Sequence, residues 1–263
     1  MRKLVLGLLL STGFLGIAAT AHANTLQEIQ KAKVLKVCMW PDYFGISYRN
    51  PRSGALQGID IHLSRDFAQE LGVKLQYVET NFANVVADVE SRKCHIAMMG
   101  VGVIPSRAER VDFSAPYLRS DVYAVTSKSN VAIKTWDDID RPGRVVSVLK
   151  GTFMDPLMKK TLKQATVQVA ERPGERERDV ESGRADVFMT DYPYTQRMLA
   201  NTDWARVIPP TRPVQPTDYA YAVAKGEAAW LARVNEFVAK IKQDGRLEKY
   251  ATEYKLQQIV VKD

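Results

Sequence analysis

The sequence is poor in the residues that metal sites and nucleophilic catalysis use. It has three histidines and two cysteines among 263 residues. His22, His62 and His95 lie far apart, without metal-ligand spacing and without a Ser/His or Cys/His pairing. There is also no P-loop and no dinucleotide-binding glycine fingerprint. We therefore expect no metal, no cofactor and no catalytic residue.

Long apolar runs are missing beyond the N-terminus, where no stretch approaches the ~20 apolar residues of a membrane span. Residues 1–23 carry two cations, Arg2 and Lys3, then a run rich in Leu, Gly and Ala that closes on Ala-His-Ala. This is the layout of a secretory signal peptide cleaved after Ala23. It predicts an exported, soluble, periplasmic protein; the alternative is an uncleaved N-terminal anchor.

Blocks of like charge are also absent. The formal net charge of +7 is spread along the chain, and nothing suggests a nucleic-acid-binding arm. The run from Glu171 to Arg184 mixes both signs, which is typical of the solvated side of a helix. We expect no nucleic-acid partner.

The two cysteines could form a disulfide, because an oxidising compartment permits one. Cys38 lies inside a predicted strand at 34–40, and Cys94 begins another at 94–104. If these strands are parallel neighbours, Cys38 lies opposite Met98, about four residues or ~13 Å from Cys94. A disulfide needs Cα atoms within ~7 Å. The pattern therefore favours two separate thiols.

Short apolar strands alternate with amphipathic helices along the whole chain, which predicts an α/β fold with largely parallel sheets. Two such units in one chain indicate two facing lobes. In the first helix Asp60 is a candidate N-cap and Gly72 a candidate C-terminal stop. The expected strands are 34–40, 74–80, 94–104, 144–151, 167–171, 185–191 and 218–226, and the expected helices are 58–72, 81–93, 152–164, 174–183, 228–245 and 246–256.

Aromatic side chains follow the first two strands. Trp40, Tyr43 and Phe44 follow the first, and Phe82 follows the second. Ligands of open α/β sheets bind beyond the carboxyl ends of the strands. These rings therefore either form an aromatic box around a ligand side chain or pack the rim of the lobe.

Polar and backbone groups follow the remaining strands. Gly100 and Gly102 leave the backbone open to a ligand, and Arg107 can grip a carboxylate through its bidentate fork. Thr152 stands at a helix start, where free N–H groups favour an anion. Asp191 either accepts an ammonium group or caps the next helix. This set complements a zwitterion with an apolar side chain.

The stretch "IPSRAERVDFSAPY" at 104–117 is similar to T-P-x-R-x-x-x-V-D-F-S-x-P-Y of the periplasmic solute-binding proteins of polar amino-acid ABC transporters, bacterial family 3. "KGTFMD" and "GRADVFMTD" also resemble family segments, and the likeness covers nearly the whole mature chain. It implies a type II two-lobed fold, with a mostly parallel sheet and flanking helices in each lobe. The implied division is a signal peptide at 1–23, lobe 1 at 24–120, lobe 2 at 121–217 and a return to lobe 1 at 218–263, with two hinge crossovers near 118–124 and 215–221.

The resemblance also implies roles for individual residues. Arg107 corresponds to the carboxylate-binding arginine and Asp191 to the ammonium-binding acid, whereas Arg110 falls at a variable, solvated position. The remaining implied ligand contacts are backbone groups of Thr152 and Phe153, the loop residues Trp40 and Tyr43, and Phe82.

Departures from the family pattern bear on the ligand. Gly100, Gly102 and Ile104 stand where members usually carry hydroxyls, so only backbone groups are offered there. Trp40 and Ser47 replace acids typical of members that bind cationic amino acids. An unpartnered buried cation is costly, so a neutral or aromatic ligand is favoured over a cationic one.

The implied activity is non-enzymatic capture of a small amino acid or related carboxylate, and its delivery by a monomer to an inner-membrane ABC permease. One alternative is an enzyme on the same fold, a cyclohexadienyl or arogenate dehydratase with Asp191 as the general acid. The other is a sensor that presents its ligand to a membrane receptor.

Overall fold

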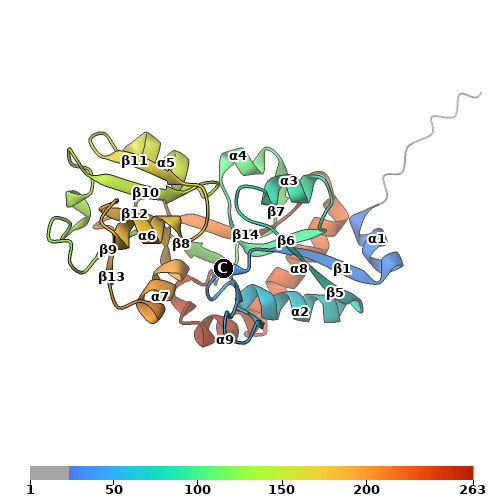
Figure 1. Cartoon of the computed structure of the whole chain (residues 1–263). Helices are drawn as coiled ribbons and strands as arrows, with labels where there is room; N and C mark the ends of the chain where they lie inside the picture. Colours follow the sequence, from blue (N-terminus) through green and yellow to red (C-terminus); the bar gives the residue numbers. More distant parts are fainter. Residues whose placement is uncertain (1–23, 263) are drawn as a thin grey trace, which may run out of the picture.

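A computed structural model describes residues 24–262 and arranges them as three β-sheets with helices packed around them (Figure 1). The predicted signal peptide at 1–23 lies outside the described residues. Within 24–262, no helix is both long enough and apolar enough to cross a bilayer.

The first sheet combines a parallel half with an antiparallel half. Strands β5, β1 and β6 are parallel, and β14 pairs antiparallel with β6, β7 and β8. Every residue of the central strand β6 is buried, as expected of a strand covered on both faces. In sheet order the strands are β5 (Lys74–Glu79), β1 (Val34–Met39), β6 (Ile96–Gly102), β14 (Thr217–Ala224) and β7 (Val111–Phe113), with β8 (Leu118–Ser120) also on β14.

The second sheet repeats this plan. Strands β11, β10 and β12 are parallel, and β9 runs antiparallel between β12 and β13. In order the strands are β11 (Thr166–Ala170), β10 (Val145–Leu149), β12 (Val187–Asp191), β9 (Val122–Ser127) and β13 (Ala205–Ile208). A small antiparallel sheet joins β2 (Asp42–Tyr43), β3 (Ser47–Arg49) and β4 (Leu56–Gln57).

The helices divide between the two large sheets. We call the first sheet, the small sheet and their helices the first lobe, and the second sheet and its helices the second lobe. First-lobe helices are α1 (Thr25–Ala32), α2 (Ile59–Leu71), α3 (Val85–Glu90), α4 (Pro105–Ala108), α8 (Ala228–Gln243) and α9 (Arg246–Glu253); second-lobe helices are α5 (Met154–Thr161), α6 (Glu175–Glu181) and α7 (Tyr192–Asn201). Short 3₁₀ turns lie at Trp136–Asp138 and Gln257–Ile259.

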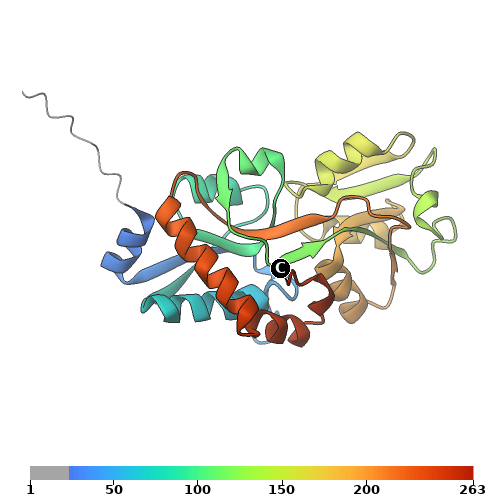
Figure 2. The same cartoon turned by 180° about the vertical axis from the view of Figure 1, so that it is seen from behind.

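The chain passes between the lobes twice. It leaves the first sheet at the end of β8, enters the second at Val122 in β9, and returns after β13 to Thr217 at the start of β14. Seen from behind, β8 and β14 of the first sheet run side by side where that sheet meets the second lobe, and α8 lies along the first sheet (Figure 2). The two crossings lie together, because Ser120 at the end of β8 pairs with Thr217 at the start of β14.

The prediction of two separate thiols is wrong. Cys38 and Cys94 form a disulfide, with their Cα atoms 5.5 Å apart. Cys38 does lie close to the expected register, opposite Ala97. However, β6 begins only at Ile96, and the chain bends before it, so Cys94 is not on the extended line that the spacing argument assumed.

The predicted helix at 58–72 is confirmed, but the role of Asp60 in it is not. Gly58 is the N-cap of α2, and Gly72 ends the helix in a left-handed conformation at φ 64°. Asp60 lies in the first turn, fully buried, and its carboxylate points away from the helix end toward β6. It accepts hydrogen bonds from the backbone N–H of Gly100 and from the hydroxyls of Tyr117 and Tyr221.

Candidate functional site

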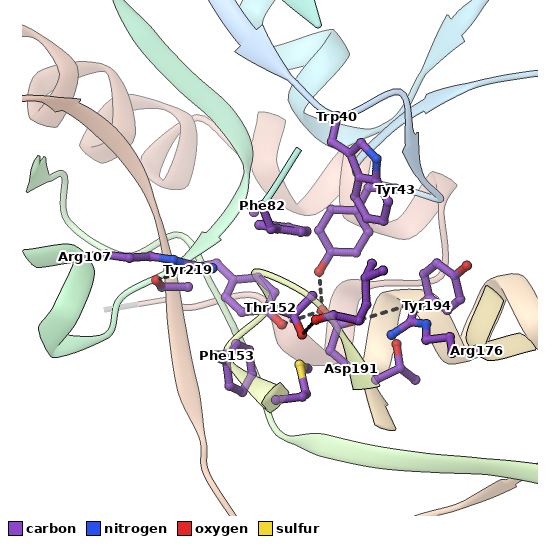
Figure 3. Close-up of a pocket in the computed structure, with 15 residues that line it drawn as sticks. Trp40, Tyr43, Phe82, Arg107, Thr152, Phe153, Arg176, Asp191, Tyr194 and Tyr219 are labelled. Carbon is purple, nitrogen blue, oxygen red and sulfur yellow. Dashed lines mark hydrogen bonds between the residues drawn. The ribbon is translucent and has the colours of Figure 1, made fainter. Parts of the chain in front are cut away.

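A cavity lies between the lobes, and all nine residues predicted from the sequence line it (Figure 3). Its empty volume is about 390 Å³. The nine residues come from the carboxyl ends of parallel strands in both lobes and from the loops that follow them.

Arg107 is a buried cation in the short helix α4, with 6% of its surface exposed. Its Nη1 donates to the Gly102 carbonyl oxygen at 2.9 Å, and its Nη2 donates to the Gly151 carbonyl oxygen of the second lobe at 3.0 Å. The guanidinium also lies 5.6 Å from the ring centre of Phe82. No carboxylate within residues 24–262 forms an ion pair with it. Burial lowers the pKa of Arg107 to about 10, so the group stays charged at neutral pH.

Arg110, three residues further on, has a different environment. It is exposed, and it forms a two-pronged ion pair with Glu90 on the surface, with Nε 2.9 Å from Oε1. The predicted contrast between a buried Arg107 and a solvated Arg110 is therefore present in the structure.

Asp191 is a buried carboxylate at the end of β12, with 5% of its surface exposed. It caps α7, because Oδ1 accepts from the backbone N–H of Tyr194 at 3.2 Å. Its other oxygen, Oδ2, accepts from the hydroxyls of Tyr43 and Tyr219, both of the first lobe. Burial raises the pKa of Asp191, and these hydrogen bonds partly oppose that shift. The helix-cap alternative and the cavity position are thus both realised.

Three of the four predicted aromatic side chains, all but Phe44, form one cluster. The ring centres of Trp40, Tyr43 and Phe82 lie 5.3 to 5.7 Å from one another. Such tilted and edge-on contacts are favourable between aromatic rings. Phe44 turns away from the cluster and packs on Tyr48. The cluster forms an apolar wall on the first-lobe side of the cavity (Figure 3).

Gly100 does not present a free N–H group as expected. Its N–H donates to the buried Asp60 at 3.0 Å, and the carbonyl of Gly102 accepts from Arg107. Gly100 has φ +61°, and a Cβ there would lie 3.0 Å from a ring carbon of Tyr43. Glycine is needed at this position for its backbone conformation and for the room it leaves to the tyrosine ring.

Thr152 and Phe153 lie just before α5, which begins at Met154, two residues later than the predicted helix at 152–164. The N–H and the hydroxyl of Thr152 both donate to the Leu149 carbonyl oxygen, at 3.2 and 2.7 Å, so the N–H is not free in this conformation. Phe153 is the N-cap residue and lines the cavity near Gly102.

Six cavity residues were missed by the sequence analysis: Leu149, Met154, Arg176, Thr190, Tyr194 and Tyr219. Tyr219 lies in β14, where only the pairing of β14 with β6 places it beside Gly102. Arg176 belongs to the run from Glu171 to Arg184 that was interpreted as solvated. That interpretation is wrong for Arg176, which is 3% exposed. A charged residue two positions after a helix-starting glycine offered no sequence signal of burial.

Two charged side chains of the cavity, the cation Arg107 and the anion Asp191, form no salt bridge within residues 24–262. In this described part of the chain Arg107 has no anionic partner, and Asp191 is held by neutral hydroxyl and amide donors, with the nearby charge of Arg176 also lowering its pKa. In the view of Figure 3 Arg107 and Asp191 lie on different sides of Tyr219. Arg176 forms an ion pair with Glu177, so the two residues together add no net charge. Among residues 24–262, no group of three or more His, Cys, Asp or Glu residues could hold a metal ion.

Comparison with known proteins decides the family. The family model of the bacterial extracellular solute-binding proteins, family 3, matches residues 35–257. The chain belongs to this family. The match spans both lobes and confirms the family and the two-lobed α/β fold predicted from the sequence.

Relatives of this family 3 protein include binding proteins and an enzyme. Cyclohexadienyl dehydratase of Pseudomonas aeruginosa is 29% identical over 209 residues, which cover 79% of this chain and 78% of that protein. The L-cystine-binding protein TcyJ of Escherichia coli is 24% identical over 240 residues, covering 89% of this chain and 87% of that one. A solved structure of an ancestral amino acid-binding protein, a precursor of cyclohexadienyl dehydratase, is 31% identical with a TM-score of 0.79, and covers 88% of this chain and 99% of that one.

Proposed function

We propose that this protein is an extracytoplasmic solute-binding protein that captures a small amino acid or related carboxylate between its lobes. It works in the periplasm as a monomer and delivers the ligand to the inner-membrane permease of an ABC transporter. Arg107 grips the ligand carboxylate and Asp191 its ammonium group. Trp40, Tyr43 and Phe82 contact the ligand side chain.

The observation that carries this proposal is the state of Arg107. A guanidinium that is buried without a counter-charge is costly, and an anionic ligand would supply the missing charge. Its two protein acceptors are carbonyls from opposite lobes, so a carboxylate bound there would contact the group that already bridges them. The carboxylate Asp191 supports an ammonium group on the same ligand.

Calorimetry on the Arg107→Ala variant tests the proposal. We expect the variant to lose at least ~3 kcal/mol of binding free energy, because a ligand carboxylate would be buried without its partner. Arg110→Ala is the matched control, since it removes an exposed arginine three residues away and should leave affinity unchanged. Equal affinity of the Arg107 variant and the wild type would exclude the assignment.

The ligand class follows from the wall of the cavity. The aromatic cluster holds no acid, and Ser47, where cation-binding members carry an acid, donates its hydroxyl to the Trp40 carbonyl oxygen at 2.8 Å. A cationic side chain would therefore be buried without a counter-charge. We expect neutral or aromatic amino acids to raise the melting temperature of the mature protein in a thermal-shift screen, and lysine and arginine to raise it less.

A second candidate is dehydratase activity, favoured by the likeness to cyclohexadienyl dehydratase. Asp191 would be its general acid, and the raised pKa of this buried carboxyl suits proton donation. Incubation with prephenate or arogenate, followed by product absorbance, distinguishes the two functions. A capture protein gives no turnover, and an enzyme gives turnover that Asp191→Asn abolishes.

A further inference from the structure

We propose that Arg176 reads the far end of the ligand side chain, and that it selects side chains that end in a hydrogen-bond acceptor oxygen. The oxygen belongs to an amide of a neutral side chain or to a carboxylate, and the preference against cationic ligands excludes neither. The inference rests on the proposed capture function and goes beyond it, because it names the part of the ligand that Arg107 and Asp191 leave unspecified.

The first support is the placement of Arg176. It lies in the first turn of α6, it is 3% exposed, and it lines the cavity. Figure 3 shows it on the opposite side of Asp191 from Arg107. A ligand held by its carboxylate at Arg107 and by its ammonium at Asp191 would extend its side chain toward this second guanidinium.

The second support is how rigidly the guanidinium is held. Nη1 donates to the Met189 carbonyl oxygen and Nε to Glu177 Oε1, each at 2.9 Å. The guanidinium carbon lies 4.3 Å from the ring centre of Tyr194 and 4.9 Å from that of Phe188. A group fixed in this way binds a ligand without losing further rotational freedom.

The third support is the donor chemistry of Arg176. Nε and Nη1 donate to protein acceptors, and the Tyr194 hydroxyl is a further side-chain partner of the guanidinium. A ligand oxygen would share the guanidinium donors on this side with the Tyr194 hydroxyl. The N–H groups of Arg176 can only donate, so a ligand that offers another donor or a cation leaves them unsatisfied.

Charge balance explains why a neutral acceptor is sufficient. Glu177 compensates the charge of Arg176, and burial of this pair in the second lobe leaves no net charge to be neutralised by the ligand. An amide oxygen then completes the donor set, and a carboxylate oxygen does so with added attraction. A ligand ammonium or guanidinium meets a like charge.

The experiment compares ligands of equal shape by calorimetry on the full mature protein. Each pair sets a side chain that ends in an acceptor oxygen against an apolar side chain of similar shape. Asparagine and aspartate are each paired with leucine, and glutamine and glutamate are each paired with homoleucine. We expect the acceptor member of at least one pair to bind roughly tenfold tighter or more. Comparing the affinity of aspartate with that of asparagine, and of glutamate with that of glutamine, shows whether a carboxylate or an amide is preferred.

Variants separate recognition from a structural role. Arg176→Lys keeps the charge beside Glu177 but loses the fork, and the double variant Arg176→Met/Glu177→Gln removes the pair together. The double variant should bring the affinity ratio within each pair close to one, and Arg176→Lys should lower it, because an ammonium cannot reproduce the planar set of donors. Arg206→Gln is the matched control in the same lobe, because Arg206 donates to the Asn130 and Ile133 carbonyl oxygens outside the cavity. It should leave the ratio unchanged.

Each failure has a distinct meaning. If no amino acid or related carboxylate binds the wild type, the proposed function fails. If amino acids bind but the wild type shows no preference within either pair, the role of Arg176 is overturned while capture stands. The same conclusion follows if the folded Arg176→Lys variant keeps the wild-type ratio, since damage to packing alone would weaken both members of a pair alike.

Discussion

Asp42 and Arg197 form an ion pair that joins the two lobes beside the cavity. Asp42 lies in β2 of the first lobe and Arg197 in α7 of the second, with Nη1 2.7 Å from Oδ1. The same Nη1 also donates to the Asp42 carbonyl oxygen at 3.1 Å and to the Tyr194 hydroxyl at 3.2 Å. Neither charged residue lines the cavity, so this contact stabilises closure without touching a ligand.

Removing this ion pair should favour the open arrangement of the lobes. We expect Asp42→Asn and Arg197→Gln each to weaken ligand affinity several-fold, because a partly exposed pair contributes on the order of 1 kcal/mol to the closed state. Small-angle scattering of the ligand-free protein should show a larger radius of gyration. Arg49→Gln is the control, since its partner Glu79 lies in the same lobe. Unchanged affinity and dimensions in both variants would show that the pair does not govern closure.

The buried Asp60 should make stability depend on pH. Burial raises its pKa from 3.8 to about 7, although Tyr117, Gly100 and Tyr221 all donate to it. The unfolded carboxyl ionises first, so the contribution of Asp60 to stability is full below about pH 4 and is lost as pH rises through 7. Between these values the loss is about 1.4 kcal/mol per pH unit.

Urea unfolding at pH 5, 6, 7 and 8 checks this dependence, read as the difference between the wild type and Asp60→Asn. We expect the wild type to lose stability relative to the variant as pH rises over this range. His95, whose pKa burial lowers to about 4, changes stability in the opposite sense below pH 6.5 but is common to both proteins. A difference that stays constant from pH 5 to 8 would contradict the raised pKa.

Gly100 should be needed for affinity as well as for stability. Gly100→Ala forces an L-residue to φ +61° and places a Cβ 3.0 Å from the Tyr43 ring. We expect the ring to shift and to displace the Tyr43 hydroxyl, which donates a hydrogen bond to Asp191. We expect a loss of about 1–3 kcal/mol in unfolding free energy and a clear loss of ligand affinity. Gly72→Ala is matched in strain, with φ +64°, but meets no atom within 4 Å. It should cost stability alone, and equal affinities in the two variants would count against a role for Gly100 in the site.

Much of the cavity could be predicted because parallel α/β topology gathers the carboxyl ends of strands. Arg107 and Asp191 are more than eighty residues apart in the chain, yet each follows an apolar strand that reads clearly from its pattern. Once two lobes were inferred, their strand ends had to face a common cleft. The same argument placed Trp40, Phe82 and Thr152.

Other features depend on contacts that no local pattern encodes. The disulfide depends on a bend before β6, which a spacing rule for extended strands cannot include. Gly100 was expected to present its N–H to a ligand, but the fold turns it to Asp60 instead. Tyr219 reaches Asp191 only because β14 returns to the first sheet.

The sequence by itself determined the secretory pattern, the alternation of strands and helices, the family and the strand-end positions of the predicted site residues. These are properties of local periodicity and of order along the chain, which survive without knowledge of packing. Only the tertiary structure decided which charges are buried and which are paired. Arg107, Arg110 and Arg176 are the same residue type in the sequence, but burial and neighbouring acceptors give them different states. Arg107 is a buried cation without a counter-charge, Arg110 is part of a surface ion pair, and Arg176 is a fixed donor in the cavity wall.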